Sequence, residues 1–308
     1  MNIAVVQAAG VLFDASAGVE HFCAKLQSAA TPGTRLVVFP ENFIGGYPRG
    51  LQFGAVVGDR TAEGRRLWQR YYDGAIDVPG PETERMAKAA KEAGTFVVVG
   101  IVERDSSFGR GTLYSTVLYF SPVGELLHKH RKLKPTAAER YIWGEGDGST
   151  LKVVPTEIGK LGALVCWESY MPLARMALYA QGVEIYIAPT ADSRPGWQAT
   201  LQHIALEGRC FVVGCNMYVP ENAAIETGGE QPRSTLSRGG SAVYGPLGDC
   251  LAGPVFDEEA TLRADIDLAD CARGKFDFDV VGHYSRPDVF SFAVDDTPRV
   301  PVRFKTQE

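Results

Sequence analysis

The sequence predicts a single α/β domain in which the strands form a mixed sheet. Short apolar runs rich in valine and isoleucine alternate with helical patterns in some stretches and pair through tight turns in others. This combination favours a mixed sheet over an all-parallel one. Although a chain of 308 residues often forms two domains, no linker-like change of composition and no internal repeat divides it.

In the first third of the chain, strands and helices alternate. Residues 82–93 carry alanine and methionine at helical spacing and end at Gly94, a common helix stop. Residues 95–103 have a continuous apolar centre, which is typical of a strand buried on both faces. The other elements expected here are strands at 3–9 and 35–40, a helix at 19–30 and an excursion at 51–80.

From residue 112 onward the pattern changes to hairpins. A turn at residues 122–124 separates two predicted strands, 113–120 and 125–133, and residues 246–248 form a second turn. The remaining predicted elements are strands at 160–167, 183–188, 211–218, 240–244 and 261–266, helices at 172–181 and 197–210, and a surface loop at 219–239.

Composition excludes several classes of function. Lys and Arg total 31 and Asp and Glu total 37, so the formal net charge is −6. Such a chain has no general attraction for nucleic acid or anionic lipid. No apolar run approaches the roughly 18 residues that a membrane helix needs, and the N-terminus has no basic region typical of a secretory signal. We therefore expect a cytoplasmic protein with no nucleic-acid or membrane partner.

No metal site is expected. The six cysteines form no CxxC pair, so most of them are expected to be reduced, buried side chains. His128 and His130 share one face of a strand but have no evident third ligand. The glycine-rich segment 144–148 lacks the periodic acidic residues of a calcium loop, and the basic segment 129–134 is short and without interleaved aromatics.

Three polar residues end apolar strands. Cys166 follows a buried strand just before a helix start at Pro172, Glu41 follows residues 36–40, and Lys132 lies at the end of a hairpin strand. A thiol nucleophile needs a base, and the anion formed by its attack needs a fixed cation or N–H donors. A carboxylate and an ammonium group meet these needs. By spacing alone, a buried structural cysteine is favoured over a nucleophile at Cys166, and Glu41 and Lys132 are more commonly solvated strand ends.

Four motifs resemble the nitrilase superfamily, and more narrowly its true nitrilase branch. The Trp-Glu pair after the cysteine separates nitrilases from most amidase branches, residues 282–288 also resemble nitrilases, and the likeness extends from residue 2 to about residue 292. Lys134 departs from the apolar residue that many nitrilases carry there. The motifs are Phe39-Pro40-Glu41-Asn42-Phe43, residues 130–136, residues 139–148 and Leu164-Val165-Cys166-Trp167-Glu168.

The resemblance implies a four-layer αββα sandwich of two mixed sheets, with one catalytic domain over 1–292 and a C-terminal tail at 293–308. By matching position, Cys166 is the nucleophile, Glu41 the general base, and Lys132 the cation that stabilises the intermediate and lowers the pKa of the thiol. Glu139 positions the lysine and the attacking water. The backbone N–H of Trp167 is the second donor to the intermediate. No cofactor is implied.

The implied reaction converts a nitrile to a carboxylic acid and ammonia through a covalent thioimidate and thioester. Trp143, Trp167, Tyr170 and Thr190 are the candidate substrate-binding residues, although Trp143 and Tyr170 equally fit ordinary packing aromatics. Aryl, arylaliphatic and aliphatic nitriles all suit this set. An amidase of the same superfamily and a catalytically silent ligand-binding relative are the alternatives.

The resemblance also implies a homodimer or a larger spiral homo-oligomer. The helices at 171–181 and 197–209 are the expected contacts between subunits.

Overall fold

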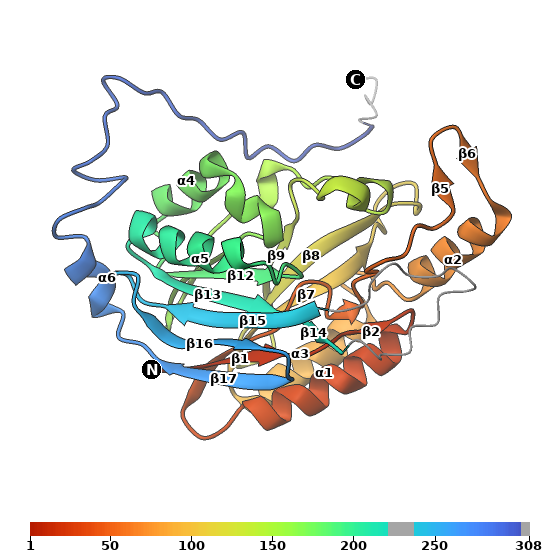
Figure 1. Cartoon of the computed structure of the whole chain (residues 1–308), viewed down its shortest axis with the longest axis horizontal. Coiled ribbons are helices and arrows are strands. Elements are labelled where there is room, and N and C mark those ends of the chain that lie inside the picture. The colour runs from red at the N-terminus through yellow and green to blue at the C-terminus, as the bar shows by residue number, and fades with distance from the viewer. Residues whose placement is uncertain (221–236, 303–308) are drawn as a thin grey trace, which may run out of the picture.

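The computed structural model describes residues 1–220 and 237–302, and it consists of two mixed sheets packed face to face between helices (Figure 1). The first sheet has the strand order β17, β1, β3, β7, β8 and β9. In addition, β4 pairs with β7, and β2 pairs with β4. The strands of this sheet are β1 (Asn2–Gln7), β2 (Val11–Leu12), β3 (Thr34–Val38), β4 (Ile44–Gly45), β7 (Phe96–Arg104), β8 (Leu113–Phe120), β9 (Leu126–Arg131) and β17 (Ala260–Asp265).

The second sheet follows the order β10, β11, β12, β13, β15 and β14, with β16 paired to β15. Its central strands β11, β12 and β13 are parallel, whereas β15 is antiparallel to β13. The strands are β10 (Val154–Thr156), β11 (Gly159–Ala163), β12 (Ile185–Thr190), β13 (Phe211–Asn216), β14 (Tyr218–Val219), β15 (Ser237–Tyr244) and β16 (Cys250–Phe256).

Side chains that alternate along β1 show how the first sheet packs between the second sheet and the helices. Ile3 and Val5 of β1 face the second sheet in the central apolar cluster. Ala4 and Val6 face the opposite way, toward α1 (Ala15–Ala29) and α3 (Pro81–Ala93). This two-residue period is the geometry of a strand with both faces covered.

The outer face of the second sheet is covered in the same way. Its apolar side chains pack against α4 (Pro172–Ala180) and α5 (Pro195–Gly208). The order helix, sheet, sheet, helix confirms the predicted αββα sandwich.

The structure differs from the sequence expectation at two places. The predicted strand 160–167 leaves the sheet after Ala163, and Cys166 begins a 3-10 helix, η3 (Cys166–Tyr170), with a left-handed φ of 53°. The excursion at 51–80 holds elements that were not predicted, namely α2 (Ala62–Asp73) and a small hairpin of β5 (Ala55–Val56) and β6 (Asp59–Arg60). Most of the predicted loop at 219–239 lies outside the described residues.

After α6 (Ala269–Gly274) the described chain contains neither helix nor strand, and it runs along one side of the molecule (Figure 1). It is attached near η2 (Gly148–Thr150), where the Arg299 N–H donates to Asp147 Oδ2 at 2.6 Å. Across residues 1–220 and 237–302, the helices are all too short or too polar to cross a bilayer. The six cysteines are free thiols.

Candidate active site

The three strand-end residues singled out in the sequence meet between the two sheets. Glu41 follows β3, Lys132 follows β9 and Cys166 follows β11. The Lys132 Nζ lies 2.8 Å from Glu41 Oε1, and the side chains of both residues are completely buried. The structure therefore brings a carboxylate, an ammonium group and a thiol into one buried cluster.

Glu139 completes this cluster. Its Oε2 accepts from Lys132 Nζ at 2.8 Å and from the Thr136 N–H at 2.6 Å, while its Oε1 accepts from the Tyr47 hydroxyl at 2.7 Å. Thr136 precedes the 3-10 helix η1 (Ala137–Tyr141), so the first turn of η1 fixes the direction of the Glu139 side chain. Lys132 is consequently held between two carboxylates.

The Cys166 thiol is held on its other side by β12. Thr190 is the last residue of this strand, and its Oγ1 donates to Cys166 Sγ at 3.1 Å. Cys166 is 4% exposed. A left-handed φ at a residue with a side chain is unfavourable and persists only where neighbouring contacts hold it.

Burial dominates the electrostatics of this cluster. Burial raises the pKa of Glu41 to about 7 against the opposing charge of Lys132. Burial and the Glu41 charge likewise raise the pKa of the Cys166 thiol above its ordinary range, and they outweigh Lys132, which acts to lower it. Although burial acts to lower the pKa of Lys132, Glu41 and the other neighbouring acidic groups hold it above its usual value. Lys132 therefore acts to lower the thiol pKa, as the resemblance implies, while burial and Glu41 decide the net direction of the shift.

The raised pKa of Cys166 favours the protonated thiol. Among the described residues, Glu41 Oε2 has no conventional hydrogen-bond partner, and a contact with the Cys166 thiol lowers the pKa of Glu41. With a pKa near neutrality, the Glu41 carboxylate is placed to accept the thiol proton at the moment of attack.

A pocket of about 190 Å³ opens onto the thiol. On its rim, the Trp167 Nε1 donates to Asp192 Oδ2 at 2.9 Å, and the guanidinium of Arg194 lies 4.6 Å from the centre of the Trp167 ring. Arg194 Nε also donates to Asp192 Oδ1 at 2.8 Å. The lining residues are Tyr47, Arg49, Thr136, Glu139, Cys166, Trp167, Ala191, Asp192, Ser193 and Arg194.

The four candidate substrate-binding residues occupy different places. Trp167 lines the pocket, and Thr190 contacts the thiol. Trp143 is 3% exposed and lies behind the cluster, with Lys132 Nζ 5.9 Å from the centre of its ring. Tyr170 is 40% exposed, packs edge-on against Trp167, and is not a lining residue.

Sequence reasoning missed seven lining residues, namely Tyr47, Arg49, Thr136, Ala191, Asp192, Ser193 and Arg194. Asp192 and Arg194 follow Thr190 at the end of β12, so strand-end placement, the signal that found Cys166, could have found them. Tyr47 and Arg49 come soon after β4, a two-residue strand that was not predicted, and the fold brings them to the thiol.

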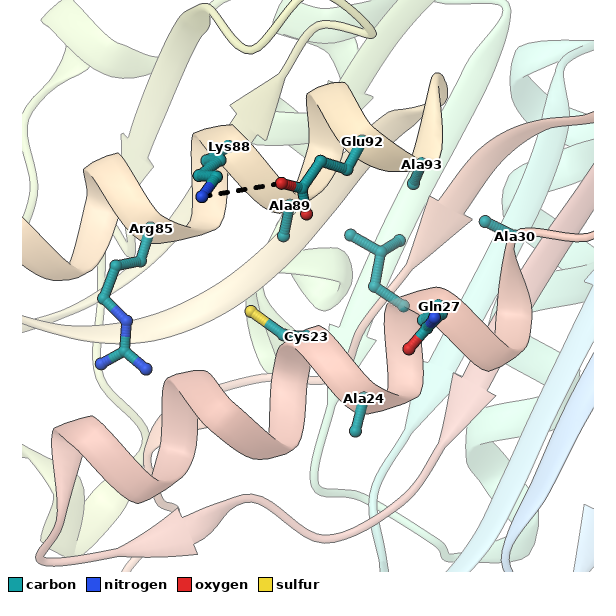
Figure 2. Close-up of a pocket in the computed structure, with 10 residues that line it drawn as sticks. Cys23, Ala24, Gln27, Ala30, Arg85, Lys88, Ala89, Glu92 and Ala93 are labelled. Atoms are coloured by element: carbon teal, nitrogen blue, oxygen red, sulfur yellow. Dashed lines mark ion pairs between the residues drawn. The ribbon is translucent and has the colours of Figure 1, made fainter.

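A larger cavity lies elsewhere. Its volume is about 630 Å³, and residues of α1 and α3 line it on the outer face of the first sheet. Figure 2 shows Cys23 between these helices, with Lys88 paired to Glu92 at 3.7 Å on the α3 side. None of the strand-end residues of the buried cluster lines it, so it is separate from the candidate site.

The sequence pattern of the carbon-nitrogen hydrolase family matches residues 2–276, nearly the whole chain. The chain belongs to this family. A bifunctional nitrilase/nitrile hydratase of Lupinus angustifolius is 52% identical to this carbon-nitrogen hydrolase, over 97% of this chain and 87% of the relative. An aliphatic nitrilase of Sinorhizobium fredii is 51% identical over 97% of each chain.

Solved structures confirm the fold of this carbon-nitrogen hydrolase. A carbon-nitrogen hydrolase from Helicobacter pylori superposes with a TM-score of 0.73 at 21% identity, over 94% of this chain and 96% of its own. Saccharomyces cerevisiae Nit3, a member of branch 10 of the nitrilase superfamily, gives a TM-score of 0.72 at 20% identity, over 92% of this chain and 96% of its own.

Proposed function

We propose that this carbon-nitrogen hydrolase converts nitriles to carboxylic acids and ammonia, with Cys166 as the nucleophile. The observation that carries the proposal is the buried cluster of Glu41, Lys132 and Glu139 beside a buried thiol. Identity of about half the sequence with curated nitrilases supports the choice of nitriles as the substrate. We assign the catalytic domain to residues 1–292.

The reaction begins when Sγ of Cys166 forms a bond to the nitrile carbon. Glu41 accepts the thiol proton and passes it to the nitrile nitrogen, which gives a thioimidate. Water then adds with Glu41 as base, ammonia leaves, and a thioester remains. A second water hydrolyses the thioester and releases the carboxylic acid, so two waters are consumed for each ammonia released.

Lys132 and the backbone stabilise the charge that develops on the substrate nitrogen. The Lys132 ammonium is a fixed cation in a buried site, where such a charge acts strongly. Trp167 is in the first turn of η3, where backbone N–H groups have no intrahelical acceptor, and it supplies a second donor. Glu139 holds Lys132 in place and orients the attacking water.

The size of the pocket favours compact nitriles. Its volume of about 190 Å³ is below the 300–1,000 Å³ that is typical of sites for drug-sized ligands. Trp167 forms an aromatic wall beside the thiol, so small aliphatic and single-ring aryl nitriles fit better than long arylaliphatic ones.

Ammonia release from matched nitriles and amides tests this proposal. We expect kcat/KM to be higher for a compact nitrile than for its amide, and to fall as the chain or ring system grows. A higher value for the amide would favour the alternative, an amidase of the same superfamily. Release from neither substrate, with Cys166 unreactive toward alkylating agents, would favour a catalytically silent relative.

We further propose that subunits associate through residues 171–181 and 197–209. Three large apolar side chains are exposed there, namely Met171, Leu173 and Leu206, and Leu173 is 67% exposed. Where exposed apolar side chains form a contiguous patch, they mark a contact surface. Light scattering should give at least twice the 33.3 kDa mass of one chain, and a monomer mass would contradict the proposal.

The cytoplasm is the compartment that we propose. The six cysteines are all free thiols, which suits a reducing environment.

A further inference from the structure

A second buried ionisable pair lies beside the catalytic cluster and has no part in the reaction described above. The Glu168 side chain is completely buried, and its carboxylate accepts from two backbone N–H groups at 2.6 Å, Leu133 on Oε1 and Val165 on Oε2. Leu133 directly follows Lys132, and Val165 directly precedes Cys166. One carboxylate therefore joins the two segments that carry the catalytic cation and the nucleophile.

His130 holds this carboxylate from a third direction. Its Nε2 lies 3.2 Å from both Glu168 oxygens, and its Nδ1 lies 3.1 Å from the Thr150 carbonyl oxygen. Since both acceptors are oxygens without a proton to donate, both ring nitrogens donate when the two bonds are made together. Burial acts to lower the pKa of His130, but the Glu168 carboxylate holds it above the ordinary value. The hydrogen-bond geometry therefore favours an imidazole ring that donates from both nitrogens, with Glu168 as one of its two acceptors.

We propose that the His130–Glu168 pair is a positioning device that sets the distance and orientation of Lys132 relative to the Cys166 sulfur. Neither residue lines the pocket, so neither is a catalytic residue. The inference rests on the proposed nitrile hydrolysis, because it assigns the pair a role in that reaction.

The local geometry explains why such a device is needed. Cys166 and Lys132 both lie beyond the ends of their strands, and Cys166 has a left-handed φ of 53° that its own backbone disfavours. The two segments are 34 residues apart in sequence, between Lys132 and Cys166, and the Glu168 carboxylate hydrogen-bonds to both. A shift of about 1 Å between reacting groups costs on the order of 100-fold in rate.

Glu168→Gln tests the inference. The amide keeps the size of the side chain but turns an N–H donor toward Leu133 or Val165, so one of the two backbone bonds is lost. We expect kcat to fall on the order of 100-fold and KM to change less than twofold. Alkylation of Cys166 by iodoacetamide, followed by peptide mass spectrometry, should slow at least tenfold. A merely structural role would lower the Tm and leave both rates per folded molecule unchanged.

Glu103→Gln is the matched control. Glu103 is also a buried glutamate that pairs with side chains of β9, namely Lys129 at 2.5 Å and Arg131 at 2.6 Å, but its carboxylate does not join the Lys132 segment to the Cys166 segment. This variant should lower the Tm while keeping kcat and the alkylation rate within twofold of the wild type.

His130→Gln decides the question if Glu168→Gln does not fold. It removes the imidazole ring and leaves both backbone bonds of Glu168, so we expect a smaller loss in both kcat and alkylation rate. Wild-type kcat and alkylation rate in a folded Glu168→Gln would overturn the inference. If that variant does not fold, wild-type rates in a folded His130→Gln would overturn it. If the wild type released no ammonia from nitriles but the alkylation rate still fell, the proposed function would be wrong and the positioning role would stand.

Discussion

Cys166→Ala is expected to abolish nitrile turnover, with kcat falling at least ~10⁴-fold, as for other enzymes that lose a covalent nucleophile. The loss follows because the sulfur that forms the bond to the nitrile carbon is removed, and because Glu41 and Lys132 have no other nucleophile to activate in this cluster. Steady-state ammonia release from the purified variant measures the effect. Residual activity above about one per cent would exclude Cys166 as the nucleophile.

Cys215→Ala is the control for this variant. Cys215 is a completely buried cysteine of the central apolar cluster, and its thiol contacts the backbone carbonyl of Val6 at 3.4 Å. The substitution removes the same atom from a similarly buried site. We expect a lower Tm and a kcat near that of the wild type.

Glu41→Gln has the second large expected effect, a fall in kcat/KM of ~10²–10⁴-fold, the usual contribution of a general base. The amide still accepts a hydrogen bond from Lys132, but it cannot take the proton of the Cys166 thiol. The wild-type pH profile provides the companion measurement. Because burial raises the pKa of Glu41 to about 7, and only the charged carboxylate is a base, kcat/KM should rise with pH up to about 7 and then level.

The rise of kcat/KM with pH reports the ionisation of the coupled cluster rather than of one group alone. In Glu41→Gln the residual activity should therefore lose its dependence on a group that titrates near pH 7. If kcat/KM of this variant still rose with pH as in the wild type, another group would be the base.

Local patterns in the sequence predict the mixed arrangement of strands and the strand-end placement of Glu41, Lys132 and Cys166, whereas the two-sheet sandwich follows from the family resemblance. Alternating apolar residues mark strands, and a polar residue just after such a run marks the edge of a sheet. The unpredicted α2 carries a helical pattern that the expectation for residues 51–80 left out. Within it Leu67 and Tyr71 are buried at helical spacing, the other positions are mostly polar and exposed, and the Thr61 side chain accepts from the Gly64 N–H at the start of the helix.

The remaining features of the site depend on contacts between distant segments. Thr190 contacts the thiol, and Glu168 joins residues that are 32 positions apart, Leu133 and Val165, only because the strand ends meet in space. Burial also decides the sign of the Cys166 pKa shift. A sequence shows that Lys132 is a cation, but it does not show how much water the thiol has lost.

Mass spectrometry of enzyme quenched with acid during turnover tests the central claim most directly. With a slowly hydrolysed nitrile in excess, the peptide that contains Cys166 should carry the substrate as a thioimidate or a thioester. Cys166→Ala should carry no adduct. Steady turnover without an adduct on Cys166, or an adduct on one of the other five cysteines instead, would contradict a covalent mechanism at this residue.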